Sequence, residues 1–485
     1  MTTMEFKKGH ILPTVRIQKI ILENFKSVTY GEVLFNCGRK TVPQDTESDI
    51  LGIYGQNGSG KTAVIEALYI LQHAMRGWSI DSEYSECISE GAEYSKFSFT
   101  FDLQYPPDNK TRTVTYAFKM GKIPNEAFYN EELRARDPLS HELLYENNVK
   151  IYDEEISAGG FFNNSNQKMQ VILSTFSGKY PIGPVRKISQ YVGEYKEESF
   201  VELEVNKRSS LKTSKSFIFA EETMELFYNN SGYSEYFQVL MELSWYAQHY
   251  LFVISSSMAS LGGGMMVMPL FSRKGSEVVI ALGDLSKISQ ERYERIKDVI
   301  NGINQVLPSL VTGLTVELRY EKVITGDTIK YDVKLYSKRN DCMIPLRDES
   351  AGLIRIISIL SLIISAFNER SITVAIDELD AGVYEYLLGE ILSGLETYGK
   401  GQFIFTSHNL RPLEVLKKES IIFTTTNPEN RYIRLKGVGH TNNLRSLYLR
   451  EILGDSQDEQ IYDAAKRQRM IAAFLKAGGV HGKEK

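Results

Sequence analysis

Cysteine is scarce in this sequence, and the few residues present lie far apart. Only Cys37, Cys87 and Cys342 occur among 485 residues, with no C-x-x-C pair, so neither a disulfide framework nor a zinc site is indicated. Long apolar runs are also missing, because the longest, residues 356–367, contains three serines and is too short to cross a bilayer. The N-terminus lacks the apolar core of a signal peptide. We therefore expect a cytoplasmic protein with no membrane segment, and a membrane partner stays open.

A large net charge is absent as well. The chain carries −5 at pH 7, with 42% hydrophobic and 24% charged residues, which is typical of an ordinary globular protein and argues neither for nor against nucleic acid. The distribution is uneven, since residues 411–485 hold 14 Lys and Arg against 9 Asp and Glu. This basic end could receive a polyanion or an acidic partner, although solvated lysines are the commoner explanation.

The sequence GQNGSGKT at residues 55–62 has the spacing G-x-x-x-x-G-K-[ST]. It follows a short apolar run that predicts a buried strand, residues 50–54, and precedes residues 63–74, which predict a helix. Glycines let backbone N–H groups converge on a phosphate at the N-terminus of such a helix. Lys61 would reach the β- and γ-phosphates, and the Thr62 hydroxyl would hold Mg²⁺. The flanking elements disfavour a chance match, so we predict an ATP site formed by Gly55, Asn57, Gly58, Ser59, Gly60, Lys61 and Thr62.

A pair of acidic residues follows a predicted buried strand in the C-terminal part of the chain. Residues 371–376 form a β-branched run that ends in Asp377 and Glu378. Ligands of open α/β sheets gather at the carboxyl ends of strands, so both acids should face the glycine loop. Asp377 can orient Mg²⁺, directly or through water, and Glu378 can polarise the attacking water. Without the glycine loop, a surface pair of acids would be the better interpretation.

Two further polar groups are predicted near the same edge. The predicted strand at residues 402–406 leads to His408, whose side chain is placed to contact a γ-phosphate. Standing alone, His408 would be an ordinary loop histidine. Ser350 and Gly352 open an apolar helix that runs to about residue 367, and its N-terminus is either an anion-binding site or a simple serine cap. Physical reasoning alone leaves these two alternatives even.

The order of patterns predicts an α/β fold with a mixed sheet and an antiparallel β lobe, interrupted by a mainly helical insertion. Alternating residues 14–28, 31–36, 95–104 and 112–119 predict two hairpins. Helical patterns follow, the clearest at residues 236–254 and 286–307, and strands return at 314–320 and 328–336. The expected parts are residues 1–155 and 309–425 as two halves of one ATPase domain, 156–308 as the insertion, and 426–485 as a basic extension.

These motifs together resemble the ABC-type ATPases of the SMC, RecF and OLD-like branch. NFKSV, GQNGSGKT, ESAGLIR, VAIDELD and TSHN occur in the order of that family and cover both ends of the chain. The resemblance implies a head-to-tail dimer, in which ATP on one subunit meets Ser350 and Gly352 of the other. It also makes Asp377 and Glu378 the Walker B pair.

The remaining assignments also come from the resemblance. Asp380 takes the place of the D-loop residue and His408 that of the switch histidine. Gln104, at the end of an alternating strand, is the candidate for the glutamine that binds Mg²⁺ in this family, although its spacing does not fix it. Two departures are visible: ESAGL differs from the LSGGQ of transporters and resembles the S-x-G-x-x-R form of bacterial defence ATPases, and Tyr384 replaces a common histidine. Lys26 is placed near the nucleotide.

The choice among such ATPases depends on what is missing. Long coiled coils are absent, and only about 75 residues follow His408, too few for a TOPRIM nuclease domain. The layout is similar to the stand-alone ATPase subunits of two-component anti-phage systems, of the PARIS (AriA-like) kind or, second, the Septu (PtuA-like) kind. This implies an ATP-hydrolysing sensor and scaffold that forms a homo-oligomer, controls a separate TOPRIM-type nuclease or toxin, and responds to a phage protein or to DNA.

Two other functions stay open. A RecF-like DNA-repair ATPase would clamp DNA in its ATP-bound dimer, and its DNA binding would rise with ATP and fall steeply with salt. A structural protein that does not hydrolyse ATP is disfavoured, because both Asp377 and Glu378 are present.

Overall fold

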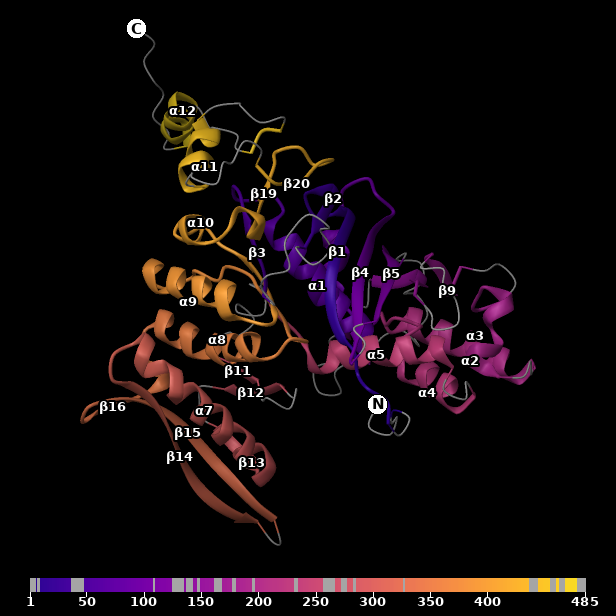
Figure 1. Ribbon diagram of the computed structural model, residues 1–485, viewed down its shortest axis with the longest axis horizontal. Coiled ribbons are helices and arrows are strands. Elements are labelled where there is room, and N and C mark those ends of the chain that lie inside the picture. The colour runs from indigo at the N-terminus through magenta and orange to yellow at the C-terminus, as the bar shows by residue number, and fades with distance from the viewer. Residues whose placement is uncertain are drawn as a thin grey trace.

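Three larger sheets and the helices around them make up the part of the chain that the computed structural model describes (Figure 1). The described residues are 6, 9–35, 48–107, 110–123, 135–136, 143–145, 149–160, 168–176, 180–193, 197–230, 234–255, 267–271, 277–281, 285–325, 328–435, 444–453, 459–461 and 467–477.

The first sheet has six strands in the order β10-β17-β18-β3-β19-β20, and only the last pair is antiparallel. Its members are β3 (Asp49–Tyr54), β10 (Leu251–Ile254), β17 (Thr373–Ile376), β18 (Gln402–Thr406), β19 (Ile421–Thr424) and β20 (Tyr432–Ile433). The five parallel strands are buried along their whole length, as expected where helices cover both faces. Thr406 pairs with Ile53, and Ile376 pairs with Phe405. The carboxyl ends of β3, β17 and β18 therefore lie level with one another.

Helices cover both faces of this core sheet. They are α1 (Lys61–Arg76), α8 (Ala351–Asn368) and α9 (Glu385–Tyr398). Leu51 and Ile53 of β3 pack into one hydrophobic core with α1, whereas Ile50 and Tyr54 point into a second core with α8 and α9. The loop that leaves β3 thus lies between two packed layers, and this fixes its position.

An antiparallel sheet of order β2-β1-β4-β5-β8-β9 packs on the other side of α1. Its strands are β1 (Thr14–Phe25), β2 (Val28–Leu34), β4 (Tyr94–Tyr105), β5 (Lys110–Lys122), β8 (Val149–Ala158) and β9 (Gln170–Ser174). Phe97, Phe99 and Phe101 alternate with more exposed residues on β4, as their period of two predicts. The two sheets meet where the Gln402 side chain bonds the backbone of Ile17, at 2.7 and 2.9 Å.

Four helices extend this lobe, seen beside β5 and β9 in Figure 1. They are α2 (Ser189–Val192), α3 (Glu197–Lys212), α4 (Glu221–Asn230) and α5 (Glu235–His249). Short 3-10 turns occur at Ser82–Cys87, Val185–Lys187, Leu346–Asp348 and Lys418–Ser420.

A third sheet and a long helix form a separate core. The sheet consists of β13 (Leu285–Ser289), β14 (Leu314–Thr325), β15 (Thr328–Arg339) and β16 (Cys342–Pro345), and the helix is α7 (Gln290–Leu310). Its hydrophobic residues pack against one side of α8. The remaining elements are β6 (Ala135–Arg136), β7 (Leu143–Tyr145), β11 (Val267–Phe271), β12 (Glu277–Ala281), α10 (Pro412–Val415), α11 (Leu444–Leu453) and α12 (Arg467–Ala477).

The helix predicted at residues 236–254 is too long. The α5 helix ends at His249, and residues 251–254 form β10, which pairs in parallel with β17. A run of four apolar residues fits a helix end or a strand equally well, and only the distant partner decides between them. Within residues 156–308 the structure places helices α2 to α5 and most of α7, while β9 joins the antiparallel sheet and β10 joins the core sheet.

Among the described residues, α8 is the one helix long and apolar enough to cross a membrane by length and composition. About two thirds of it, 67%, is buried inside the protein, and its apolar side chains contribute to two hydrophobic cores. This burial explains its apolar character as that of a core helix.

Candidate functional site

The glycine loop joins β3 to α1 through a left-handed residue. Gly60 has φ 91° and is the N-cap of α1, a conformation that glycine adopts with little strain. The Tyr432 hydroxyl donates to the Gly60 carbonyl at 2.8 Å. The Ser59 hydroxyl donates to the Gln56 carbonyl at 2.6 Å and also contacts the Thr424 hydroxyl. Residues of β19 and β20, far away in the sequence, therefore hold the loop in place.

The Lys61 amine lies inside this loop. Its Nζ donates to the carbonyls of Gly55 and Gln56, both at 2.9 Å, and the residue is 7% exposed. Burial lowers the pKa of Lys61, and the negative charges of Asp377, Glu378 and Asp380 oppose that effect. The structure thus brings a largely desolvated cation close to the acids predicted to act with it.

Asp377 contacts the helix start directly. One carboxylate oxygen, Oδ1, accepts from the Thr62 hydroxyl at 3.3 Å and from the Thr406 hydroxyl at 2.5 Å. The other oxygen, Oδ2, is buried and finds no hydrogen-bond donor among the described residues. A buried carboxylate oxygen without a partner, beside a threonine hydroxyl, fits Mg²⁺, which takes hard oxygen ligands and is usually bound through only one or two carboxylates.

Glu378 lies beside this pair with its side chain exposed to solvent. Its φ of 48° is left-handed, a region that residues with a side chain rarely adopt. The Glu378 backbone N–H donates to the Thr406 hydroxyl at 2.8 Å. One hydroxyl therefore binds both members of the predicted acid pair, and the strained backbone directs Glu378 outward while Asp377 points inward.

His408 and Asp380 also meet at this edge. The His408 backbone N–H donates to both carboxylate oxygens of Asp380, at 3.3 and 3.2 Å, and the His408 side chain is exposed. Asn57 and Gly58 are exposed at the tip of the glycine loop. The edge thus presents loop, acid and imidazole to solvent.

Ser350 caps α8, as one of the two alternatives predicted. Its Oγ accepts from the Leu353 backbone N–H at 3.3 Å, and Ser350 itself is exposed. A Cβ placed on Gly352 would lie 1.9 Å from the carbonyl oxygen of Gly382, so the start of α8 touches the segment that follows Asp380 in the same subunit. The role of Ser350 and Gly352 toward a second nucleotide remains a prediction.

Gln104 is not part of this site, and its prediction as a Mg²⁺ ligand is wrong. It pairs with Thr14 near the end of β4, and its Oε1 accepts from Arg370 at 3.3 Å. Arg370 precedes β17, whose opposite end carries Asp377. The end of β4 therefore lies at the amino edge of the core sheet, because this lobe is antiparallel and a strand end there need not face the ligand edge.

Three contacts were not predicted. Thr406 binds the acid pair, and Arg355 donates to the Asp377 carbonyl at 3.1 Å. Lys26, expected near the nucleotide, forms an ion pair with Glu66 of α1, and burial raises the pKa of Glu66 against the effect of that lysine. Thr406 and Arg355 belong to the TSHN and ESAGLIR motifs, so the sequence marked their positions but gave no sign of what they touch.

Comparisons with known proteins place the chain in a family. Residues 50–414 match the family described as "AAA domain, putative AbiEii toxin, Type IV TA system". A search of the curated proteins finds no match.

Solved structures that are similar include Smc heads and RecF. An Smc head bound to the C-winged helix domain of ScpA is 14% identical, with 86% of this chain and 97% of that chain covered and a TM-score of 0.40. The SMC head domain from Thermotoga maritima is 14% identical, covering 87% and 99%, with a TM-score of 0.34. The recombination mediator protein RecF is 12% identical, covering 85% and 99%, with a TM-score of 0.33.

The family match spans well over half of the chain and includes the glycine loop, the acid pair and His408. The core sheet carries these groups at the carboxyl ends of β3, β17 and β18. The chain belongs to the family described as "AAA domain, putative AbiEii toxin, Type IV TA system", and it has an α/β fold in which a mixed core sheet carries the glycine loop.

Proposed function

We propose that the chain binds Mg·ATP at the glycine loop and hydrolyses it slowly to ADP and phosphate. The observation that carries this proposal is the buried Oδ2 of Asp377, which lacks a partner although Oδ1 of the same carboxylate is bound by Thr62 and Thr406. An unpartnered buried carboxylate oxygen is costly unless a cation or donor joins it. Thr62 and Asp377 would hold Mg²⁺, which neutralises charge on the phosphates when it is bound.

The other residues have separate roles in this proposal. Lys61 exchanges its two carbonyl partners for phosphate oxygens, and the loop from Gly55 to Gly60 surrounds the phosphates with backbone N–H groups. Glu378, which is exposed and directed away from Asp377, accepts a proton from the attacking water. His408 contacts the γ-phosphate from the end of β18.

ATP is proposed to join two copies of the chain head to tail. The exposed serine cap of α8 offers a helix N-terminus to a phosphate, and such termini favour anions. Ser350 and Gly352 of one copy would then meet the nucleotide of the other, with Asp380 at the contact. Because the γ-phosphate is shared, its hydrolysis removes the bond that joins the copies.

The biological role proposed is that of a sensor and scaffold in bacterial anti-phage defence. The family description names a putative toxin and a toxin–antitoxin system, which supports a role beside an effector. In this proposal, ATP-dependent oligomers control a separate TOPRIM-type nuclease or toxin in the cytoplasm. Pull-down from infected and uninfected cells, followed by mass spectrometry, should recover one effector with the wild-type chain.

Phosphate release from Mg·ATP tests the catalytic part. Glu378→Gln should lose at least about tenfold in rate, since removing a catalytic proton acceptor costs on the order of 10²-fold or more. Lys61→Ala should lose at least about tenfold as well, because it removes the cation that stabilises charge on the phosphates. Thr397→Val is a matched control, because that hydroxyl bonds Ser393 within α9. A Glu378→Gln chain that hydrolyses ATP at the wild-type rate would show that Glu378 is not the base. Binding of duplex DNA that rises with ATP and falls with salt would favour the RecF-like alternative.

A further inference from the structure

The outer edge of β14 is a hydrogen-bonding surface with little protection. In the order β13-β15-β14, the only strand paired with β14 among the described residues is β15, through 12 consecutive pairs without a bulge. Figure 1 shows the β14 and β15 hairpin at the margin of the molecule, away from the core sheet. Edge strands are usually blocked by charged side chains, proline, bulges or covering segments. The β14 strand contains no proline, but it carries four charged residues, Glu317, Arg319, Glu321 and Lys322.

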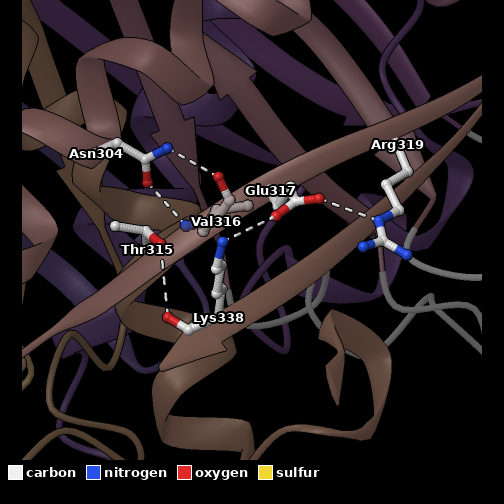
Figure 2. A network of polar contacts seen from close by, with 6 residues as sticks. All are labelled: Asn304, Thr315, Val316, Glu317, Arg319 and Lys338. Atoms are coloured by element: carbon white, nitrogen blue, oxygen red, sulfur yellow. Dashed lines mark hydrogen bonds and ion pairs between the residues drawn. The ribbon is translucent and has the colours of Figure 1, made fainter. Parts of the chain in front are cut away.

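A single side chain protects one position of this edge. Asn304 of α7 accepts from the Val316 backbone N–H at 2.7 Å and donates to the Val316 carbonyl at 2.8 Å (Figure 2). Both main-chain groups of Val316 therefore point away from β15. Because these directions alternate along an antiparallel pair, the N–H and C=O groups of Leu318, Tyr320 and Lys322 point the same way. Within the described part of the chain, the outward groups of these three residues meet no hydrogen-bond partner.

The order of charges along β14 indicates which strand could pair with this edge. We propose that β14 pairs antiparallel with β14 of a second copy of this chain, with Tyr320 opposite Tyr320. This register sets Arg319 of each copy opposite Glu321 of the other, and opposite charges directly across an antiparallel pair are favourable. It also sets Leu318 opposite Lys322, so the three free residues of each strand bond one another. A register centred on Arg319 would instead oppose like charges.

The side-chain contacts within the chain leave this charge pair available. Glu317 is already neutralised by Arg319 Nε at 3.0 Å and Lys338 Nζ at 3.8 Å (Figure 2). Arg319 is 56% exposed, uses Nε for that contact and lies with its guanidinium over the Tyr336 ring, 5.2 Å from Cζ to the ring centroid. Its terminal N–H groups make no ion pair among the described residues and can reach a second carboxylate. Glu321 is exposed and meets no cation among the described residues. The edge thus has one cation and one carboxylate placed to complement a copy of itself.

This contact is independent of the proposed ATP-dependent dimer. It uses no residue of the glycine loop, the acid pair or α8, so a failure of either proposal leaves the other standing. The experiment accordingly uses the full chain carrying Lys61→Ala, without nucleotide, and measures self-association by sedimentation velocity over a range of concentrations.

The charge reversal Arg319→Glu should raise the dissociation constant at least about tenfold, because two like-charge pairs replace two favourable ones. The double variant Arg319→Glu with Glu321→Arg should restore association. That double variant does not restore the contact of residue 319 with Glu317, so rescue reports the contact between copies. Lys330→Glu, on the same sheet but on β15, is the control and should leave association unchanged.

Disulfide trapping gives a second readout. Arg319→Cys with Glu321→Cys, in a Cys342→Ser background, places two thiols across a pair whose Cα atoms lie about 4.5 Å apart, within disulfide reach. Oxidation should yield a reducible dimer, and either single cysteine alone should yield far less. A chain that is monomeric at every concentration, a double charge variant that stays dissociated, or a double cysteine variant that does not cross-link would each overturn the proposal.

Discussion

The geometry of the acid pair depends on the side-chain hydroxyl of Thr406. It donates to Asp377 Oδ1 at 2.5 Å and accepts from the Glu378 backbone N–H at 2.8 Å. Thr406→Val keeps the shape but removes both bonds, so Glu378 loses the support of its left-handed backbone. We expect kcat to fall about tenfold to hundredfold, as small misplacements of catalytic groups do. The KM for ATP should change little, because the glycine loop is untouched.

A conservative change separates positioning from packing. Thr406→Ser retains the hydroxyl and should keep most of the activity, whereas a merely structural role would make the smaller serine worse than valine. Steady-state ATPase kinetics over a range of Mg²⁺ concentrations measures both variants. Equal rates for the valine and wild-type chains would contradict the role of the hydroxyl.

At the residue scale, the sequence predicted the groups of the site but not their partners. Lys61, Thr62 and Asp377 were placed correctly near one another because each follows or precedes a strand with a clear pattern. Thr406 was missed because its role depends on two residues some 28 positions earlier, a contact that spacing does not reveal. Gln104 failed because nothing in its local sequence says at which edge of the core sheet its strand ends.

The start of α8 packs closely against the segment after Asp380, where Gly352 lies against Gly382. A Cβ on Gly352 would lie 1.9 Å from the Gly382 carbonyl oxygen, so Gly352→Ala must move α8. We expect it to lower the free energy of unfolding by about 1–3 kcal/mol, the usual cost of overpacking. Urea denaturation measures this effect.

Gly394→Ala is the matched control for that change. Gly394 lies inside α9, and a Cβ there would meet only Phe367 at 3.9 Å. Since alanine is the better helix former by up to about 1 kcal/mol, this variant should be neutral or more stable. A Gly352→Ala chain as stable as Gly394→Ala would show that α8 is free to shift.

A buried carboxylate ties the antiparallel sheet to the segment before α4. Glu154 of β8 is 0% exposed and accepts from Tyr116 at 2.6 Å and from the Phe217 backbone N–H at 2.7 Å. Burial raises the pKa of Glu154 above its ordinary value of 4.5, and these hydrogen bonds only partly offset that. An acid with a raised pKa in the folded state stabilises the fold below its unfolded pKa. This stability is lost as the pH rises through the folded value.

Glu154→Gln should therefore remove a pH dependence. The free energy of unfolding of the wild type should fall relative to that of the variant as the pH rises from about 4 to 7. Urea titrations at several pH values measure it, and Glu155→Gln at the neighbouring half-buried position is the control. A difference that stays constant, or that grows with pH, would contradict the raised pKa.

At the element scale, strands and helices with a long, clear period were predicted well. The pattern placed β18 at residues 402–406 as observed, and the predicted helix after the glycine loop differs from α1 by two residues at each end. The pattern failed at β10, because LFVI follows directly on an amphipathic helix and continues its apolar character. Only pairing with β17, more than a hundred residues later, makes those four residues a strand.

The whole molecule would have two different interfaces if both proposals hold, one at the nucleotide and one at β14. Each proposed interface has a twofold axis, so either interface alone gives only a dimer. Two different twofold interfaces on one chain instead continue into larger assemblies.

Glu378→Gln with Mg·ATP should hold the nucleotide contact closed, because hydrolysis no longer separates the copies. Light scattering after gel filtration should then show species larger than a dimer. Adding Arg319→Glu should reduce them to dimers, and adding Lys61→Ala should leave only the β14 dimer. A Glu378→Gln chain that stops at a dimer with ATP would show that the two contacts cannot form together, since each chain would then use only one of them at a time.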